Sequence, residues 1–455
     1  MALFRSKNIN MTDGNILPSI IRYSIPIVIG GVIQVLFNAA DLAVVGNFSQ
    51  SKTAAGAAVG ATGSFTALIV NLFMGISVGV NVILARSLGS NDEERSQRIV
   101  HTAVLASVVG GLIIMGIGMP LSGFAMDRMG CPAESRDMAV QYLMIYFAGA
   151  PGILLYNVGA AIMRSNGDTQ RPMIFLVIAG VLNVALNVVF VKFFYLEAAG
   201  VALATTLTQY LSAFLTLRCL FRETDATRLE FKKLRIYGRE LYDIIRYGVP
   251  SGATNCLFAI SNLQIQSVIN TYGIAAMNGN SASSSLESVF ATVISAFSAA
   301  TVAFTGQNIG AGKPDRVKKS IVTSLMVTVA FIFVTTWASS FLCSPLLGLY
   351  NSDPEVIEMG KIRYVILMRS YFICTAYNII NSASQAFGYS LPVMICSVFS
   401  IVGIRFLWML TVYPKYQTFE MIYYCYTVSW TVNVIAALAV FMIAYSRYRK
   451  AGKTA

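Results

Sequence analysis

The sequence predicts an all-α integral membrane protein. Of its 455 residues, 56% are hydrophobic and only 12% are charged, against about 25% charged residues in soluble domains. The mean hydropathy is +0.65. Uninterrupted apolar runs recur along the chain, each of about the 20 residues that a helix needs to cross a bilayer. These observations exclude a soluble enzyme, and they exclude a transmembrane β-barrel, whose strands alternate apolar and polar residues.

Twelve apolar segments are predicted to span the membrane. We place them at residues 17–46, 53–82, 96–119, 135–164, 170–193, 197–221, 241–271, 276–305, 315–342, 356–387, 390–413 and 419–447. Several are longer than a bilayer requires, so we expect tilted or bent helices. Pro26, Pro151 and Pro250 lie in or near the starts of spans, where proline favours a bend. The first 16 residues are polar and lack the apolar core of a signal peptide, so the first span is expected to remain as an anchor.

The longest polar stretch inside the chain, residues 222–240, lies near its middle. We interpret it as a solvated connector. The predicted organisation is therefore an N-terminal six-helix lobe at 1–222, a cytoplasmic linker at 223–240 and a C-terminal six-helix lobe at 241–455.

The positive charges predict the orientation. Of the 33 Lys and Arg residues, 24 lie at the two termini and in the loops after spans 2, 4, 6, 8 and 10. Seven, including Lys361 and Arg363, are assigned to the opposite face, and Arg369 and Arg405 fall inside spans. Because Lys and Arg of short loops stay in the cytoplasm, both termini are expected there. The net charge of +12 is then explained by topology and by contact with membrane lipids, and we expect no nucleic-acid partner.

Cysteine and histidine offer no metal site. The seven cysteines form no C-x-x-C pair and most lie in apolar runs, which is typical of buried thiols. His101 is the single histidine, so a histidine-based metal site is not expected.

The two halves of the chain resemble each other. Residues 20–26 (IIRYSIP) and 244–250 (IIRYGVP) share five of seven residues. Gly89 and Gly310 match in the turns after spans 2 and 8, and Tyr156-Asn157 matches Tyr377-Asn378, at offsets of 221 to 224 residues. Since six spans preserve orientation, the halves are parallel repeats about an axis along the membrane normal. Two such bundles form a cleft, which favours a transporter with alternating access over a channel.

An ordered set of motifs identifies a family resemblance. The set contains Pro26, Asp41 with Gly46, the glycine-rich turns after spans 2 and 8, Tyr156-Asn157, Arg164, Gly167-Asp168-Thr169 and Pro172. It resembles the MATE family of multidrug and toxic compound extrusion transporters, of the bacterial type, over nearly the whole chain. The resemblance implies a V-shaped, pseudo-two-fold pair of six-helix bundles in the bacterial cytoplasmic membrane. It further implies a monomer without a cofactor that exports cationic or amphipathic small molecules in exchange for Na⁺ or H⁺.

Asp41 is the first candidate for ion coupling. A carboxylate inside a span is costly, so it is a functional candidate by default, and Asp41 matches the acid that the family carries in its first helix. Asn183 and Asn187 share one face of span 5, and Asn157 and Thr205 lie in spans 4 and 6. These five residues are expected to form an oxygen cage with one negative charge that suits Na⁺. Family members often have Asp where this chain has Asn187, so a proton relay through two acids is not predicted, while H⁺ exchange through Asp41 alone stays open.

Glu287, in span 8, is the other deep acid. It is expected either to neutralise a bound cationic substrate or to pair with Arg369 or Arg405 in the same half. Arg405 is interpreted as structural or paired. Substrate contacts are expected to be aromatic and Met-rich, because such side chains accept varied cations. The substrate-binding candidates are Glu287, Phe37, Tyr142, Tyr371 and Arg405.

Three other functions fit the sequence less well. A flippase for lipid-linked oligosaccharides or other lipids has a related architecture, but it needs a basic cleft, and only Arg369 and Arg405 are deep. A membrane enzyme needs clustered acids or histidines, which the chain lacks, so no catalytic residue is predicted. A major facilitator transporter also has two six-helix halves, but the turn after span 2, residues 86–91 followed by three acids, matches it poorly.

Overall fold

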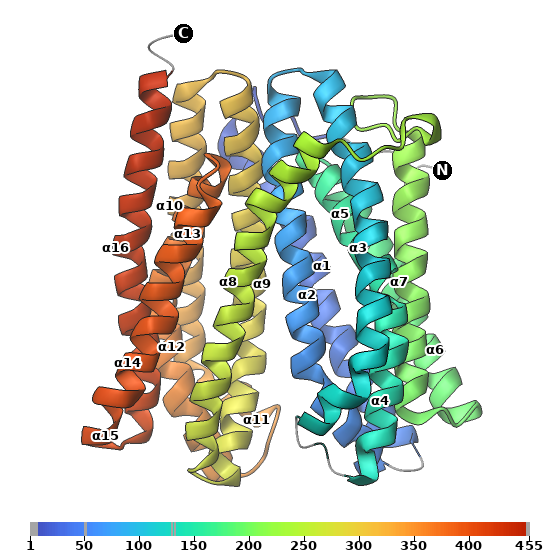
Figure 1. Cartoon of the computed structure of the whole chain (residues 1–455). Helices are drawn as coiled ribbons and strands as arrows, with labels where there is room; N and C mark the ends of the chain where they lie inside the picture. The colour runs from blue at the N-terminus through green and yellow to red at the C-terminus, as the bar shows by residue number, and fades with distance from the viewer. Residues whose placement is uncertain (1–7, 50–51, 129–130, 132, 452–455) are drawn as a thin grey trace. The chain divides into compact units, whose positions relative to one another are not determined.

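The protein consists of helices joined by short connections (Figure 1). The computed structural model describes residues 8–49, 52–128, 131 and 133–451, apart from the side chains of 42, 52–57, 59–61, 64–65, 67–69, 72–73, 133 and 451. No strand occurs in these ranges. The predicted all-α class is therefore confirmed.

The helices follow the predicted spans closely. They are α1 (Ile16–Phe48), α2 (Lys52–Gly89), α3 (Glu93–Arg128), α4 (Ala133–Ala148), α5 (Ala150–Ser165), α6 (Gln170–Val188), η2 (Val189–Phe193), α7 (Glu197–Arg222), η3 (Phe231–Lys233), α8 (Gly238–Asn270), α9 (Ile274–Gly310), α10 (Pro314–Phe341), α11 (Cys343–Gly348), α12 (Pro354–Ala386), α13 (Ser390–Ser397), η4 (Val398–Gly403), α14 (Ile404–Thr411), α15 (Tyr413–Tyr416) and α16 (Phe419–Ala451). Each predicted span coincides with one long helix or with a run of shorter ones. Proline and π-helical turns account for the runs.

Three spans are interrupted. Helices α4 and α5 meet at a bend of 45°, where Pro151 begins the first turn of α5. Helix α6 continues into the π-helix η2, and α13 continues through the π-helix η4 into α14. π-Helical turns in α-helices are frequent at functional sites. Both π-helices lie in matching spans of the two repeats, the fifth and the eleventh.

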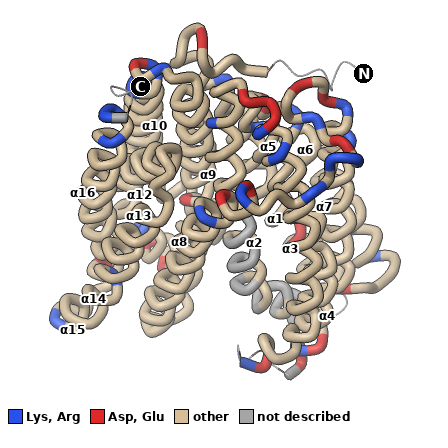
Figure 2. Tube along the Cα trace, turned by 45° about the horizontal axis from the view of Figure 1, so that its top comes forward, with Lys and Arg blue, Asp and Glu red and all other residues tan. Residues whose placement is uncertain are grey.

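The helices are long and apolar enough for a membrane protein. Within the described ranges, eight helices are long and apolar enough to cross a membrane. The bent pair α4–α5 makes a ninth if it counts as one span. Lys and Arg gather at helix ends and in connections, while long stretches between them carry few charges (Figure 2). This distribution is the one that a bilayer imposes, because charge in its centre is costly.

The described residues pack into two compact units. Unit 1 comprises Met1–Ile9 and Ile25–Gly248, and unit 2 comprises Asn10–Ser24 and Val249–Ala455. Helix α1 thus begins in unit 2 and helix α8 begins in unit 1, and each changes unit beside a proline, Pro26 or Pro250. The sequence division at 222 and 241 did not include this exchange. Contacts decide it, since the Tyr23 ring at the start of α1 packs edge-on against Phe304 of α9.

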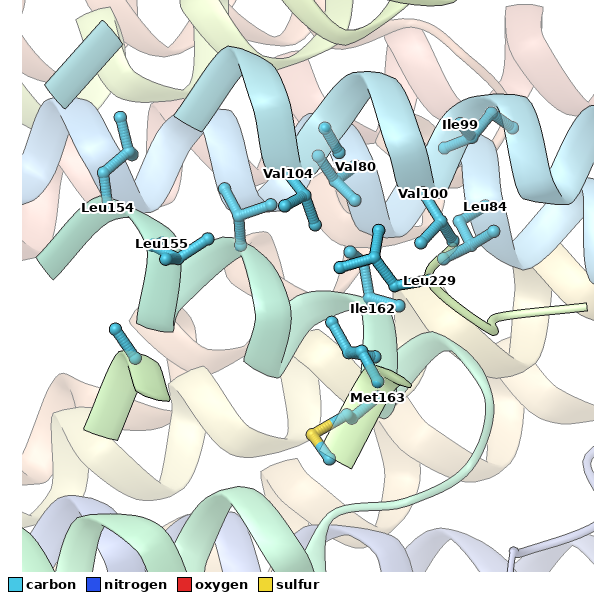
Figure 3. Close-up of a cluster of buried hydrophobic side chains, with 14 of the residues drawn as sticks. Val80, Leu84, Ile99, Val100, Val104, Leu154, Leu155, Ile162, Met163 and Leu229 are labelled. Carbon is cyan, nitrogen blue, oxygen red and sulfur yellow. The ribbon is translucent and has the colours of Figure 1, made fainter. Parts of the chain in front are cut away.

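Unit 1 has a core between α2, α3 and α5. Val80, Leu84, Val100 and Ile162 are buried there, and Leu229 of the connector joins them (Figure 3). Helices α3 and α5 approach closely where a Cβ at Gly111 would meet the backbone of Pro151. Small residues allow such crossings, which stabilise membrane helices through van der Waals contact.

In unit 2, α12 packs against α9, α10 and α16, and these helices run alongside one another in Figure 1. The closest crossing joins α9 to α12. A Cβ on Gly279 would lie 2.6 Å from Gly360 N and 2.6 Å from the carbonyl oxygen of Val356. Only glycine fits at this distance, so the crossing holds the two helices at a set separation.

The mid-chain connector is docked on unit 1. Its Glu230 N–H donates to His101 Nε2 of α3 at 3.0 Å, and its Tyr237 N–H donates to Thr102 Oγ1 at 3.1 Å. Leu229 is only 2% exposed. The interpretation of this stretch as a solvated connector is therefore incomplete, because its backbone and Leu229 complete the packing of α3.

The segment before α1 docks on unit 2 in a similar way. Asn308 Nδ2 donates to the Met11 carbonyl at 3.0 Å, and Lys313 Nζ donates to Asp13 Oδ1 at 2.7 Å. The hydrogen bond from Lys313 lowers the pKa of Asp13 below its usual 3.8. The polar segment before the first repeat is thus tied to unit 2, and the connector before the second repeat is tied to unit 1.

Candidate functional site

The predicted oxygen cage around Asp41 is partly assembled in unit 1. Asn187 Nδ2 donates to Asp41 Oδ1 at 2.5 Å and to Asn183 Oδ1 at 3.2 Å. Asn183 Nδ2 in turn donates to Thr205 Oγ1 at 3.3 Å. Asp41, Asn183, Asn187 and Thr205 therefore form one continuous polar cluster that joins α1, α6 and α7.

Local structure explains how these side chains meet. Asn183 and Asn187 are four residues apart on α6, so both project from one face of the helix. Both are buried, with Asn187 fully covered. In an apolar helix bundle, amides of this kind face other helices rather than lipid, because an unpaired amide in hydrocarbon is costly.

The cluster is rich in acceptors. Asn187 Oδ1 is buried without a hydrogen-bond partner among the described atoms. The Asn183 amide satisfies its neighbours best when its nitrogen donates to Asp41 Oδ1 at 2.9 Å and its oxygen accepts from Thr205 Oγ1 at 3.3 Å. Carboxylate, amide and hydroxyl oxygens are also ligands of hard cations, so the donor set fits Na⁺.

The other candidates of unit 1, Asn157, Tyr142 and Phe37, make contacts outside the hydrogen-bonded cluster. Asn157 Nδ2 donates to the Ile153 carbonyl of its own helix at 2.8 Å and makes no hydrogen bond to Asp41 in the described structure. Tyr142 stacks on Tyr146 with ring centroids 6.3 Å apart and interacts electrostatically with the Asp41 carboxylate. The Phe37 ring, on α1, packs directly against Gly180 of α6.

Unit 2 contains a second polar cluster, built on an ion pair. Glu287 Oε2 of α9 lies 2.5 Å from Arg363 Nη2 of α12, and Ser283 Oγ accepts from Arg363 Nη1 at 2.9 Å. Arg363 is only 6% exposed. The predicted partners of Glu287 were Arg369 and Arg405, and this pairing is wrong: the partner is Arg363, which sequence position had assigned to the opposite membrane face.

A usable signal for Arg363 was present in the sequence. It lies seven residues after the predicted start of span 10 at residue 356, two helical turns into the helix. The Gly279–Gly360 crossing brings this part of α12 against α9 and so places Arg363 beside Glu287. The crossing partner of a helix cannot be determined from periodicity alone.

Arg405 and Arg369 differ sharply. Arg405 is buried on α14, where Nη1 donates to Asn262 Oδ1 at 2.8 Å and the guanidinium lies 4.0 Å from the centroid of the Tyr426 ring. Arg369 is exposed and lies over the rings of Trp337 and Phe341, at 5.9 and 6.0 Å. The contacts of Arg405 are neutral groups, so no acid pairs with it among the described residues, and its structural role stays a prediction.

A cavity of about 290 Å³ adjoins these groups in unit 2. Its polar lining includes Asn262, Gln266, Asn280, Glu287, Arg363 and Tyr426. Tyr371, a predicted substrate contact, is 3% exposed and packs edge-on against Phe290 and Trp430. It belongs to an aromatic cluster rather than to the lining of this cavity. Among the described residues, no group of three His, Cys, Asp or Glu side chains suits a metal ion.

These features define a polytopic, all-helical membrane transporter of two repeats with buried polar clusters. The sequence model of the MatE family matches residues 26–189 and 250–409, one segment in each repeat. The chain therefore belongs to this family, the MATE multidrug efflux transporters, and it is a multi-pass membrane transporter and not an enzyme.

Relatives and solved structures agree with this assignment. A protein of Shewanella oneidensis named "FAD transporter" is 26% identical over 359 residues, which are 77% of this chain and 78% of the relative. The "Probable multidrug resistance protein YpnP" of Bacillus subtilis is 26% identical over 405 residues, 88% and 89% of the two chains. A solved structure titled "Crystal structure of MATE in the bent conformation" superposes with a TM-score of 0.88 at 21% identity and covers 98% of this chain and 99% of its own. This last likeness concerns the fold alone.

Proposed function

We propose that the protein is a secondary antiporter that exports small amphipathic organic molecules from the cytoplasm in exchange for Na⁺ or H⁺. Transport would proceed by alternating access in the bacterial cytoplasmic membrane, with both termini in the cytoplasm. The resemblance to the family favours cationic substrates, and the names of the relatives favour multidrug export over a lipid flippase. The proposal takes the chain as a monomer without a cofactor.

The Asp41 cluster is the observation on which the proposal depends. In this cluster, a carboxylate inside a membrane helix is surrounded by the amides of Asn183 and Asn187 and the hydroxyl of Thr205. The buried Asn187 oxygen, which has no hydrogen-bond partner among the described atoms, favours a bound cation or proton. Binding of either ion would neutralise the carboxylate and remove the cost of a charge in the bilayer. The state of this cluster would then determine which conformations are accessible.

Transport in proteoliposomes tests the proposal. Ethidium uptake or release is followed by fluorescence under an imposed Na⁺ gradient and, separately, under an imposed pH gradient. Stimulation by one gradient and not the other identifies the coupling ion. Asp41→Asn is expected to abolish the stimulation while the purified protein remains monodisperse, because the substitution removes the charge that the ion neutralises.

Asp137→Asn is the matched control. Asp137 lies near the start of α4 with its side chain 89% exposed, and its contact with Arg136 is a surface ion pair. This variant should transport like the parent protein. Gradient-driven transport by Asp41→Asn at the parent rate would contradict the coupling role of Asp41.

A further inference from the structure

Unit 2 contains a buried positive charge that no acid of the described chain balances. Arg405 is 4% exposed, and its contacts are Asn262 Oδ1 at 2.8 Å, Ser429 Oγ at 3.4 Å and the Tyr426 ring. All 21 Asp and Glu residues lie in the described ranges, and none forms an ion pair with Arg405. A charged group this deep in a membrane helix is expensive and usually functional.

The neighbouring acid is already occupied. Glu287 is paired with Arg363 at 2.5 Å, so a cationic substrate would have to displace a guanidinium to reach it. Counted together, Arg363, Arg405 and Glu287 leave one net positive charge beside the cavity. The amides on the lining are neutral and largely satisfied, since Asn280 Nδ2 donates to Gln266 Oε1 at 2.8 Å.

The cavity lies directly against these cationic groups. Arg363 lines it, and Asn262 and Tyr426, which hold Arg405, line it too. Arg405 is therefore separated from the cavity by the width of an amide and a phenol ring. A guanidinium as buried as Arg405 attracts an anion more strongly than one in water, because the lower dielectric around it weakens screening.

The internal repeat shows that matching spans of the two units carry different polar residues. The offset of 224 that aligns residues 20–26 with 244–250 pairs Asn38 with Asn262 and pairs Asp41 with Ile265, an apolar residue of the cavity lining. The offset of 221 that aligns Gly167 with Gly388 pairs Asn183 with Ile404, the residue before Arg405. Span 7, the match of span 1, thus has an apolar residue at the position of Asp41, whereas span 11, the match of the amide-bearing span 5, carries the base Arg405.

We propose that the unit 2 cavity binds an anionic group of the transported molecule, a carboxylate, sulfonate or phosphate, through the positive charges of Arg363 and Arg405. Arg363 contacts the anion, Arg405 adds charge from behind Asn262 and Tyr426, and Glu287 competes with the anion for Arg363. The inference rests on the proposed function, because it takes the bound molecule to be a transported one. It adds anionic or zwitterionic amphiphiles to the cationic substrates that the family resemblance favours.

Binding of three matched probes tests it. Dansyl amides that end in a two-carbon tail with an ammonium, a hydroxyl or a sulfonate group differ only in charge. Their fluorescence is titrated with the purified full-length protein in maltoside micelles free of phospholipid. The sulfonate probe is expected to bind about tenfold more tightly than the hydroxyl probe, as for a hydrogen bond to a charged group. The ammonium probe should bind most weakly.

Variants assign the effect to the cluster. Arg405→Gln should reduce sulfonate affinity about tenfold and leave the hydroxyl probe unchanged, whereas Arg405→Lys, which keeps the charge, should retain most of the affinity. Glu287→Gln should strengthen sulfonate binding, because it releases Arg363. Arg369→Gln is the matched control on α12, since Arg369 is exposed over Trp337 and Phe341, and it should change nothing.

Two results of the probe titration would contradict the proposed anion site. Equal affinity for the three probes, or tighter binding of the ammonium probe that Glu287→Gln weakens, would overturn the inference. Displacement of the sulfonate probe by one equivalent of phosphatidylglycerol would show that a lipid headgroup, and not a transported molecule, supplies the anion. The titration needs no ion gradient, so sulfonate binding with no gradient-driven transport would contradict only the proposed antiport.

Discussion

The Glu287–Arg363 pair allows a quantitative test of how unit 2 is held together. Both side chains are largely buried, with exposed fractions of 19% and 7%. Arg363→Met keeps an unbranched, flexible apolar stem and removes the charge, which leaves the Glu287 carboxylate unpaired. Removing one partner of a buried ion pair costs about 3–5 kcal/mol, mostly because the other charge is stranded. Glu287→Gln should cost a similar amount by stranding Arg363.

The double variant gives the decisive comparison. With both charges gone, no stranded charge remains, so Arg363→Met with Glu287→Gln should be more stable than either single variant. At about 2–4 °C per kcal/mol for a unit of this size, each single substitution should lower the thermal midpoint by about 6–20 °C. The midpoints are measured by intrinsic fluorescence of purified protein in maltoside micelles.

Arg369→Met provides the control for this cycle. Arg369 is exposed on the same helix, so its loss should shift the midpoint by no more than about 2 °C. If the double variant instead showed the sum of the two single losses, Glu287 and Arg363 would not act as a pair, and the reasoning from burial would be refuted. Single variants that melt with the parent protein would refute it too.

Two further predictions concern packing. Gly279→Ala adds a Cβ 2.6 Å from the backbone of α12, about 1 Å closer than an ordinary contact, and should destabilise the protein by about 1–3 kcal/mol. Gly116→Ala is the control, because its Cβ would meet nothing within 4 Å. Equal melting temperatures of the two variants would refute the close crossing. His101→Phe leaves the Glu230 N–H without its acceptor and should weaken the docking of the connector by about 1–3 kcal/mol. The expected result is faster proteolysis within residues 223–237. Unchanged cleavage would show that other contacts hold the connector.

The spans and their order were predictable because the bilayer acts on each helix separately. A helix needs about 20 apolar residues to cross the bilayer, and a run of that length can be recognised in one segment without knowledge of the others. The Asp41 cluster was largely predictable for a related reason: Asn183 and Asn187 share a helix face, and a carboxylate in an apolar run needs polar neighbours. Asn157 was expected in this cluster, yet its hydrogen bond stays within its own helix.

Pairing between helices was not predictable. Periodicity shows which face of α12 is polar but not which helix covers it, and Arg363 near a helix end has the same local pattern as a residue that reaches the headgroups. The glycine crossing at Gly279 and Gly360 selects α9 as the neighbour and Glu287 as the partner. The linker shows the same limit, since its polar composition hides the buried Leu229.

The sequence by itself therefore determined the membrane class, the twelve helical segments, the internal repeat, the family and the presence of Asp41 and Glu287 as deep acids. Each of these follows from composition, from period or from residues at fixed spacing along the chain. Only the tertiary structure decided that Glu287 is neutralised by Arg363 and that Arg405 is buried without an acid. The physical reason is that the cost of a buried charge depends on its neighbours in space, and helix packing brings together residues that are far apart in the sequence.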